Sequence, residues 1–315
     1  MFQAPRVPLL GIRDLVLLAA FGAGYVLTAL VPRRWDARAV RFIGSLALVV
    51  FRGPARKLAS RMQKTLPGAA QRDQAVQFAR EHLRLRVELW WGRLRGLRYR
   101  GWRPIVELAG AEHLRRALEA GRGVILWRMH CCENPVFLQG LATHGVSAVH
   151  LSDERHGAPS CSRLGLRWTA QLYCRAEEPY VSERIVIPLD RSLGYMREML
   201  GRLGQNAVVS IVGENRGRSN VTVSVLGSEV ELATGAPALA SKSGAALLTA
   251  HAVRLGAFHY RVLIHEPIEL NRSADRKEFV RQAVNEFARR LEARLIERPS
   301  DWMGWLRSRY PVVAD

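Results

Sequence analysis

Lysine is scarce in this chain. Only four of its 315 residues are lysines, although 47 basic against 28 acidic side chains give a formal net charge of +19. The positive charge is therefore carried almost entirely by arginine. A basic excess of this size favours an anionic partner, which can be nucleic acid, an anionic membrane surface, a phosphorylated substrate or an acidic carrier protein.

Cysteine is also rare. The four cysteines form no C-x-x-C pair, and Cys131 and Cys132 are adjacent, which suits neither a disulfide framework nor a tetrahedral zinc site. We therefore expect a reducing compartment and no structural metal. The chain also lacks internal repeats, low-complexity tracts and a clear linker, and its length fits one large α/β domain.

Uncharged residues are concentrated near the amino terminus. Residues 15–31 carry no charge over 17 positions and precede Arg33 and Arg34, which is the short limit for a membrane-spanning helix. A helix lying on the membrane surface and a buried core helix are the alternatives. A second apolar run at 42–51 is too short to span and is flanked by arginines. We predict a membrane-associated segment at 1–56 on an anionic bilayer surface, followed by an α/β domain at 57–315.

Periodicity and glycine signals predict the remaining elements. Apolar runs predict strands at 105–108, 124–127, 146–151, 185–188, 207–212, 246–254 and 260–264, and a hairpin at 221–232. Helical patterns fall at 72–99, 110–121, 135–143, 193–203, 234–243 and 274–298. This alternation predicts an α/β fold, with a mixed, largely parallel sheet flanked by helices and an N-terminal membrane-associated helical segment.

One histidine stands out at the end of a predicted strand. His130 follows the apolar run 124–127, Glu133 comes three residues later, and Glu214 follows the strand at 207–212. Parallel strands end at one edge of a sheet, where ligands bind in such folds, so Glu214 can approach His130 through space. A neutral imidazole near a carboxylate can take a proton from a hydroxyl, as acyl transfer requires. The alternative is a hydrogen-bonded histidine with only a structural role.

Several short motifs follow one another along the chain in a specific order. They are Glu112-His113-Leu114, the run GRGVIL at 121–126, His130, residues 208–215, Leu226-Gly227, the run TGAPALA at 234–240, Arg254, and Pro299 with Trp302 and Trp305. In this order and spacing, nearly the whole chain resembles the bacterial lipid A biosynthesis (late or secondary) acyltransferases of the lysophospholipid acyltransferase superfamily.

The resemblance implies a function. It predicts transfer of a fatty acyl chain from acyl carrier protein or coenzyme A to a hydroxyl of a membrane glycolipid or lysolipid, with a lipid A-type acceptor and His130 as general base. It further implies the cytoplasmic face of the inner membrane, acyl carrier protein as partner, and no metal or tightly bound cofactor. A relative that acylates another acceptor, and a non-catalytic lipid-binding relative, are the alternatives.

The chain departs from the family at one position. The family pattern is His, four residues, then Asp or Glu, and here Pro135 occupies the acidic position. Three interpretations stay open. Glu133 replaces the missing carboxylate, Glu214 replaces it from the neighbouring strand, or the chain keeps only the binding groove.

Four arginines near these motifs are candidates for binding an anionic ligand. Arg155, Arg163, Arg167 and Arg216 could hold phosphates of an anionic lipid or of phosphopantetheine, or could be solvated surface residues. No nucleic-acid-binding motif is recognisable, so we expect no nucleic-acid partner. The family uses no thiol nucleophile beside its histidine, which favours a packing role for the adjacent cysteines.

Overall fold

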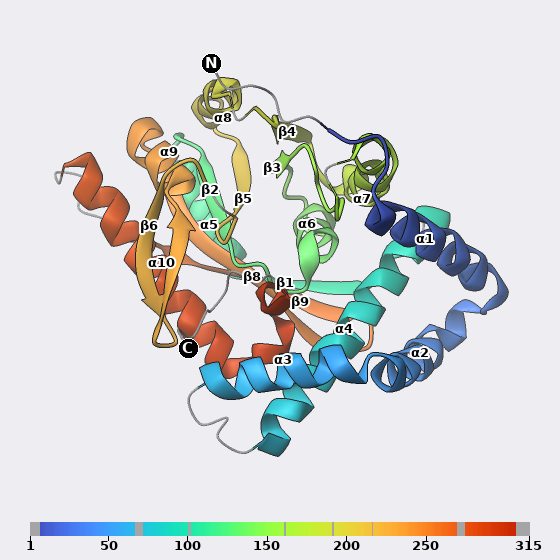
Figure 1. Ribbon diagram of the computed structural model, residues 1–315. Coiled ribbons are helices and arrows are strands. Elements are labelled where there is room, and N and C mark those ends of the chain that lie inside the picture. The colour runs from blue at the N-terminus through green and yellow to red at the C-terminus, as the bar shows by residue number, and fades with distance from the viewer. Residues whose placement is uncertain are drawn as a thin grey trace.

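A seven-stranded sheet forms the centre of the molecule (Figure 1). The structure, a computed structural model, describes residues 7–66, 72–99, 102–160, 162–190, 192–215, 217–269 and 275–306. The strand order is β1-β9-β8-β2-β5-β3-β4, and all neighbours pair in parallel except β8 and β9. The strands are β1 (Ile105–Ala109), β2 (Val124–Arg128), β3 (Ala148–Asp153), β4 (Glu183–Ile187), β5 (Val208–Val212), β8 (Ala246–Gly256) and β9 (His259–Pro267). The predicted mixed, largely parallel sheet is confirmed.

Helices surround this sheet and a separate hairpin adjoins it. They are α1 (Ile12–Leu30), α2 (Asp36–Val50), α3 (Arg52–Thr65), α4 (Arg72–Arg98), α5 (Ala111–Glu119), α6 (Glu133–Thr143), α7 (Ala170–Glu177), α8 (Gly194–Gly204), α9 (Gly235–Ser243) and α10 (Arg276–Glu297). The hairpin pairs β6 (Asn220–Val225) with β7 (Ser228–Ala233). Helix α3 carries the chain across the predicted boundary at residue 56.

Two hydrophobic cores lie on opposite faces of the sheet. On one face α8, α9, α10 and the hairpin cover the strands, and Trp127 stacks on Phe287 with ring centroids 4.2 Å apart. On the other face α5 and α6 cover Leu126 and Val208. Every residue of β2 is buried, because its apolar run faces a core on each side.

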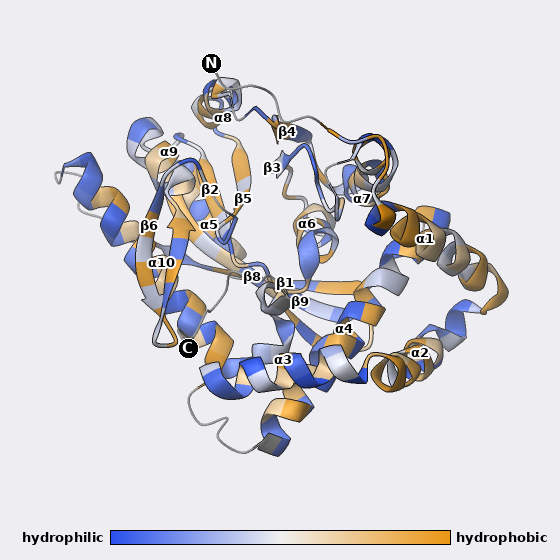
Figure 2. Cartoon of the chain, viewed as in Figure 1, coloured by the Kyte–Doolittle hydropathy of each residue, from blue (hydrophilic) through white to orange (hydrophobic). Residues whose placement is uncertain are grey.

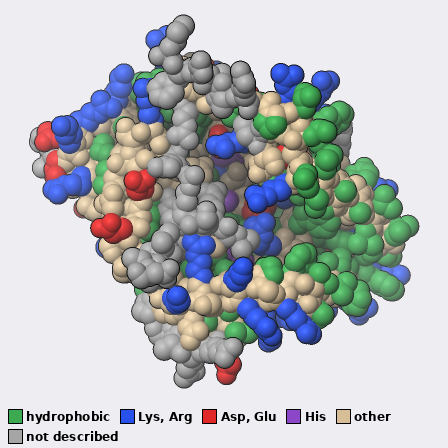
Figure 3. Space-filling view, in the orientation of Figure 1, with side chains coloured by type: hydrophobic (Ala, Val, Ile, Leu, Met, Phe, Trp, Pro, Cys, Tyr) green, Lys and Arg blue, Asp and Glu red, His purple; other side chains and the backbone are tan. Residues whose placement is uncertain are grey.

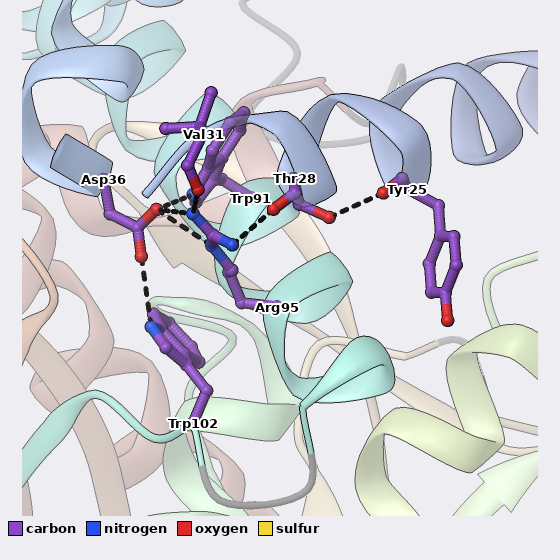
Figure 4. A network of polar contacts seen from close by, with 7 residues as sticks. All are labelled: Tyr25, Thr28, Val31, Asp36, Trp91, Arg95 and Trp102. Atoms are coloured by element: carbon purple, nitrogen blue, oxygen red, sulfur yellow. Dashed lines mark hydrogen bonds and ion pairs between the residues drawn. The ribbon is translucent and has the colours of Figure 1, made fainter. Parts of the chain in front are cut away.

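Helices α1 and α2 are joined to α4 by a buried ion pair (Figure 4). The Arg95 guanidinium bonds the Asp36 carboxylate through Nε (2.9 Å) and Nη2 (2.5 Å), and also donates to the carbonyl oxygens of Thr28 and Val31. The indole N–H groups of Trp91 and Trp102 donate to the same carboxylate at 2.8 and 3.2 Å. Arg95 therefore fixes the carboxyl end of α1 to the α/β domain.

The amino end of α1 is fixed in a different way. Asp14 is fully buried and accepts hydrogen bonds from the hydroxyl groups of Ser162 (2.8 Å) and Thr169 (3.2 Å). These two residues lie in the segment between β3 and β4, whose length predicts a functional loop or an embedded helix. It contains a π-helical turn at Gly165–Thr169 and then α7. Both ends of α1 are thus held by the domain.

The outer faces of α1 and α2 are apolar and exposed (Figure 2). Figure 3 shows hydrophobic side chains gathered on that side of the molecule. The exposed ones include Ile12, Val16, Val26 and Leu30 on α1, and Phe42, Leu46, Val49 and Val50 on α2, which together we call the apolar arm surface. By length and composition α1 could cross a membrane, and only 22% of its most apolar 18-residue stretch is buried. An exposed apolar surface this continuous is typical of a membrane or protein contact.

Candidate active site

His130 lies just past the carboxyl end of β2, where the chain leaves the sheet. The carboxy-terminal segment holds this stretch in place: Met303 N donates to the carbonyl of His130 at 2.8 Å, and Cys132 N donates to the carbonyl of Asp301 at 3.0 Å. Cys131 also forms a β-bridge with Trp302. The backbone on both sides of the histidine is therefore fixed by contacts distant in sequence.

Glu214 reaches His130 from the neighbouring strand. It follows β5, whose last residue Val212 pairs with Arg128 at the end of β2, and it is 2% exposed. Its carboxylate accepts the backbone N–H of His130 at 2.8 and 3.1 Å and the indole N–H of Trp302 at 2.9 Å. The expected approach of Glu214 to His130 through adjacent parallel strands is present, and the bonds go to the histidine backbone.

Glu133 points to a different partner. Cys132 and Glu133 have left-handed backbone conformations, with φ of 54° and 58°, at the turn from β2 into α6. The Glu133 carboxylate bonds the guanidinium of Arg93, whose charge lies 4.2 Å from the Tyr173 ring centroid. Burial favours the neutral acid, but the Arg93 and Arg86 charges outweigh it and lower the pKa of Glu133. The structure brings Glu214 to His130 and Glu133 to Arg93.

A pocket opens beside this ion pair, between α4 and the start of α6. The space between its lining atoms amounts to about 480 Å³, a volume that includes open solvent. Its lining is mostly apolar and includes Leu89, Gly92, Gly96, Trp102, Pro135, Val136, Phe258 and Tyr260. Glu133 and Pro135 also line it, and Glu133 lies three positions after His130 in the sequence. An apolar pocket with a charged pair at one side suits a ligand with a hydrocarbon chain.

A hollow faces the viewer in Figure 3, with histidine and arginine side chains visible inside it.

Of the arginines predicted to bind phosphate, Arg155, Arg163 and Arg167 are exposed, and no ion pair joins them to a carboxylate in the described ranges. Arg163 and Arg167 lie beside the amino end of α1, where Leu164 N donates to the carbonyl of Leu9. Arg216 lies outside the described residues.

The adjacent cysteines are buried and protonated. Burial raises the pKa of the Cys131 and Cys132 thiols well above the ordinary value, so neither forms a thiolate at neutral pH. Within the described ranges no three His, Cys, Asp or Glu side chains gather into a possible metal site. The residues near His130 therefore offer proton-transfer and hydrogen-bonding chemistry.

Three contributors were not predicted from sequence. Arg93 binds Glu133, Trp302 binds Glu214, and Arg128 lies buried two residues before His130. Trp302 belongs to the Pro299, Trp302 and Trp305 motif, but nothing in that motif indicates that its indole reaches Glu214, which lies 88 residues earlier at the end of a strand. Nothing in the local sequence distinguished Arg93 or Arg128 from the many other arginines.

The comparison with known families agrees with these elements. A family model described as bacterial lipid A biosynthesis acyltransferase matches residues 183–311. This part of the chain is similar to that family. The matched part contains Glu214 and Trp302, and the predicted resemblance is confirmed. No curated protein matches the chain. This similarity supports acyl transfer to a lipid-type acceptor.

Proposed function

We propose that the protein transfers a fatty acyl chain from acyl carrier protein or coenzyme A to a hydroxyl of a membrane glycolipid or lysolipid of the lipid A type. One observation carries this proposal: Glu214, a buried carboxylate in the part of the chain that resembles an acyltransferase family, holds His130 at the carboxyl edge of the sheet. This edge is where α/β folds place their reacting groups.

In the proposed reaction the hydroxyl oxygen attacks the carbonyl carbon of the thioester. The imidazole of His130 accepts the hydroxyl proton as the new C–O bond forms. The tetrahedral intermediate then collapses, the C–S bond breaks, and the imidazolium gives its proton to the leaving thiolate. No metal or bound cofactor is needed for this sequence of steps.

Glu214 is proposed as a positioning residue. Its bonds to the His130 backbone and to Trp302 tie together the ends of β2 and β5 and the carboxy-terminal segment. This arrangement favours Glu214 over Glu133 as the carboxylate that serves His130, because the Glu133 charge is compensated by Arg93. Glu133 is proposed instead to shape the mouth of the adjoining pocket.

The pocket between α4 and α6 is proposed to hold the acyl chain. Gly96 lines it, and a Cβ added at Gly96 would meet no atom within 4 Å, so a longer side chain there has room to enter the pocket. Gly96→Leu should therefore shorten the preferred acyl chain, as shown by competition between donors of different length. Gly201→Leu is the matched control, because Gly201 also lies in a helix and its added Cβ meets open space.

The apolar arm surface is proposed to lie in the plane of an anionic membrane. Both ends of α1 are bonded to the same domain. A helix that spanned the bilayer would instead have its two ends on opposite sides of the membrane. Exposed Trp35 with Arg33 and Arg34 flanks one end of α1, and exposed Trp168 with Arg163 and Arg167 flanks the other. Tryptophan and arginine are the side chains that suit a membrane interface. We place this surface on the cytoplasmic face of the inner membrane.

Vesicle flotation tests the membrane contact. Ile12→Glu combined with Phe42→Glu should abolish flotation with vesicles of neutral and anionic phospholipid. Ile296→Glu is the matched control, because Ile296 on α10 is 49% exposed and lies outside the apolar arm surface. Equal flotation of all three proteins would contradict this placement.

Lipid mass spectrometry of the native host tests the reaction. The host should make the wild type, His130→Ala, Glu214→Gln or Glu133→Gln at matched protein levels. A lipid heavier by one acyl group should require His130 and should fall strongly in Glu214→Gln. It should persist in Glu133→Gln. Absence of any His130-dependent lipid would sink the enzymatic proposal and favour a lipid-binding protein.

A further inference from the structure

Arg128 is a buried cation that forms no ion pair with a carboxylate among the described residues. Its side chain is 3% exposed. Within the described part of the chain it makes one side-chain hydrogen bond, from Nη2 to the neutral amide oxygen of Asn134 at 2.8 Å, and its Nε atom has no partner. The guanidinium also lies 4.5 Å from the centre of the Phe137 ring. Burying a cation without a counter-charge is costly, so such a group indicates a function.

The two carboxylates whose charges act on Arg128, those of Glu177 and Glu214, form their hydrogen bonds with other groups. Glu177 accepts from His156 Nε2 at 2.8 Å and from Arg184 Nη2 at 2.9 Å, and Glu214 accepts from the His130 backbone and from Trp302. Burial lowers the pKa of Arg128 to about 10, which leaves the side chain charged at neutral pH.

Arg128 and His130 lie on the same face of the sheet. Ile125, Trp127, Met129 and Cys131 belong to the core under α10, whereas Val124 and Leu126 belong to the core under α6. This alternation continues to Cys131, so Arg128 and His130 share the α6 face. Two residues of extended chain separate their Cα atoms by about 7 Å.

The backbone at the start of α6 adds partial positive charge near Arg128, and the acid at its first position, Glu133, is paired with Arg93. Asn134, the partner of Arg128, is the second residue of this 11-residue helix. The free backbone N–H groups of a helix start carry partial positive charge and attract anions. A cation and a helix start repel each other, and the same anion would stabilise both.

We propose that Arg128 binds the oxyanion that forms at the acyl carbonyl during transfer, which makes it a catalytic residue. The inference rests on the proposed acyl transfer. When the hydroxyl attacks, the carbonyl π electrons move to oxygen, and that oxygen accepts a hydrogen bond from the guanidinium. The electron pair returns as the C–S bond breaks. A fixed charge in a buried site serves such a step well, because it needs no reorganisation as the oxyanion appears.

Kinetics with purified protein test the proposal, with palmitoyl-coenzyme A and palmitoyl-acyl carrier protein as donors and a native-host lipid extract as acceptor. Arg128→Met should lower kcat about 100- to 1,000-fold and leave the KM values within about threefold. Asn134→Asp should act in the same direction, because its carboxylate would neutralise Arg128 without changing shape. Arg281→Met, on the exposed side of α10, is the control for the substitution itself.

Chemical rescue separates a catalytic from a structural role. Guanidinium ion at low millimolar concentration should restore part of the activity of Arg128→Ala. Activity of Arg128→Met and Asn134→Asp within threefold of the wild type would overturn the proposal. A loss confined to the KM of the acceptor would also overturn it, since Arg128 would then bind the ground state.

A second measurement does not depend on turnover. Hexylphosphonate, an anion with an alkyl chain, should bind the wild type in calorimetry, and Arg128→Met and Asn134→Asp should bind it at least tenfold more weakly. Equal affinity in all three proteins would overturn the anion site. Binding by a wild type that shows no turnover with any donor would instead count against the proposed acyl transfer alone.

Discussion

Two buried arginines of this molecule have opposite surroundings. Arg95 is bonded to the Asp36 carboxylate and to two backbone carbonyl oxygens, whereas Arg128 is bonded to one neutral amide. Both are almost inaccessible to solvent, at 0% and 3% exposure. Burial alone therefore does not indicate the role of an arginine. The partners do, because a compensated cation holds helices together and an uncompensated one can still bind an incoming anion.

The largest effect should follow from breaking the compensated pair. Asp36→Asn leaves Arg95 charged, buried and without its counter-charge, so unfolding free energy should fall by about 3–5 kcal/mol. Chemical denaturation followed by tryptophan fluorescence measures this loss. Glu229→Gln, on the exposed side of the hairpin, is the control and should change stability by less than 0.5 kcal/mol, as is usual for surface substitutions. A loss below about 1 kcal/mol in Asp36→Asn would mean that the ion pair contributes little.

His82 is a buried side chain that must stay neutral in the folded protein. His82 is fully buried with Nδ1 bonded to the carbonyl of Ser300 at 2.9 Å, and burial lowers its pKa to about 4. The unfolded chain takes up this proton near pH 6.5, well before the folded one. Stability is therefore complete above pH 6.5 and falls as the pH drops, by about 2 kcal/mol at pH 5 for His82 alone.

Denaturation midpoints between pH 7.5 and 5 measure the acid sensitivity. Burial also lowers the pKa of His150 and His251, which adds to the effect in the same direction. His82→Gln keeps a donor for Ser300 but cannot titrate, so its stability should depend less on pH. If the stability of that variant depended on pH as strongly as that of the wild type, His82 would not be a cause of the acid sensitivity.

Converting the uncompensated arginine into a compensated one should raise stability. Asn134→Asp gives Arg128 a carboxylate at the atom it already contacts, and hydrogen bonds to charged groups contribute about 1.5–3 kcal/mol. The unfolding free energy should rise by about 1–2 kcal/mol while acyl transfer falls. A stability gain without loss of transfer would show that the Arg128 charge is dispensable.

The smallest effect concerns a peripheral bond in the Arg95 network. Trp102→Phe removes the 3.2 Å hydrogen bond to Asp36 but leaves the bonds from Arg95 and Trp91. We expect a loss of about 1 kcal/mol in unfolding free energy, measured by chemical denaturation. A loss as large as that of Asp36→Asn would mean that the network acts as one unit.

Most of the fold was predictable from the sequence because buried parallel strands are apolar runs bounded by glycine. The run 124–127 gave β2, and its carboxyl end gave the position of His130. The contacts of the candidate site were less predictable. The left-handed backbone at Cys132 and Glu133 directs the Glu133 carboxylate to Arg93, and no local pattern signals that turn.

The residues around His130 also come from distant parts of the chain. Trp302 donates a hydrogen bond to Glu214, which lies 88 positions earlier in the chain. Such a bond produces no periodic sequence pattern around either residue, so the sequence does not predict it. The distinction between Arg95 and Arg128 has the same origin. Both sit among apolar residues, and only the three-dimensional structure reveals that Asp36 serves one of them.

The anchors of α1 have a consequence for the order of synthesis. Ser162, which bonds Asp14, is added 148 residues later. At roughly 5–20 residues per second, the ribosome needs roughly 7 to 30 s to make that interval. For all of this time the segment that binds the amino end of the helix does not yet exist, although Arg95, which binds its carboxyl end, is made earlier. Capture of α1 by the bilayer during translation would shield it, so the membrane would act as its first folding partner.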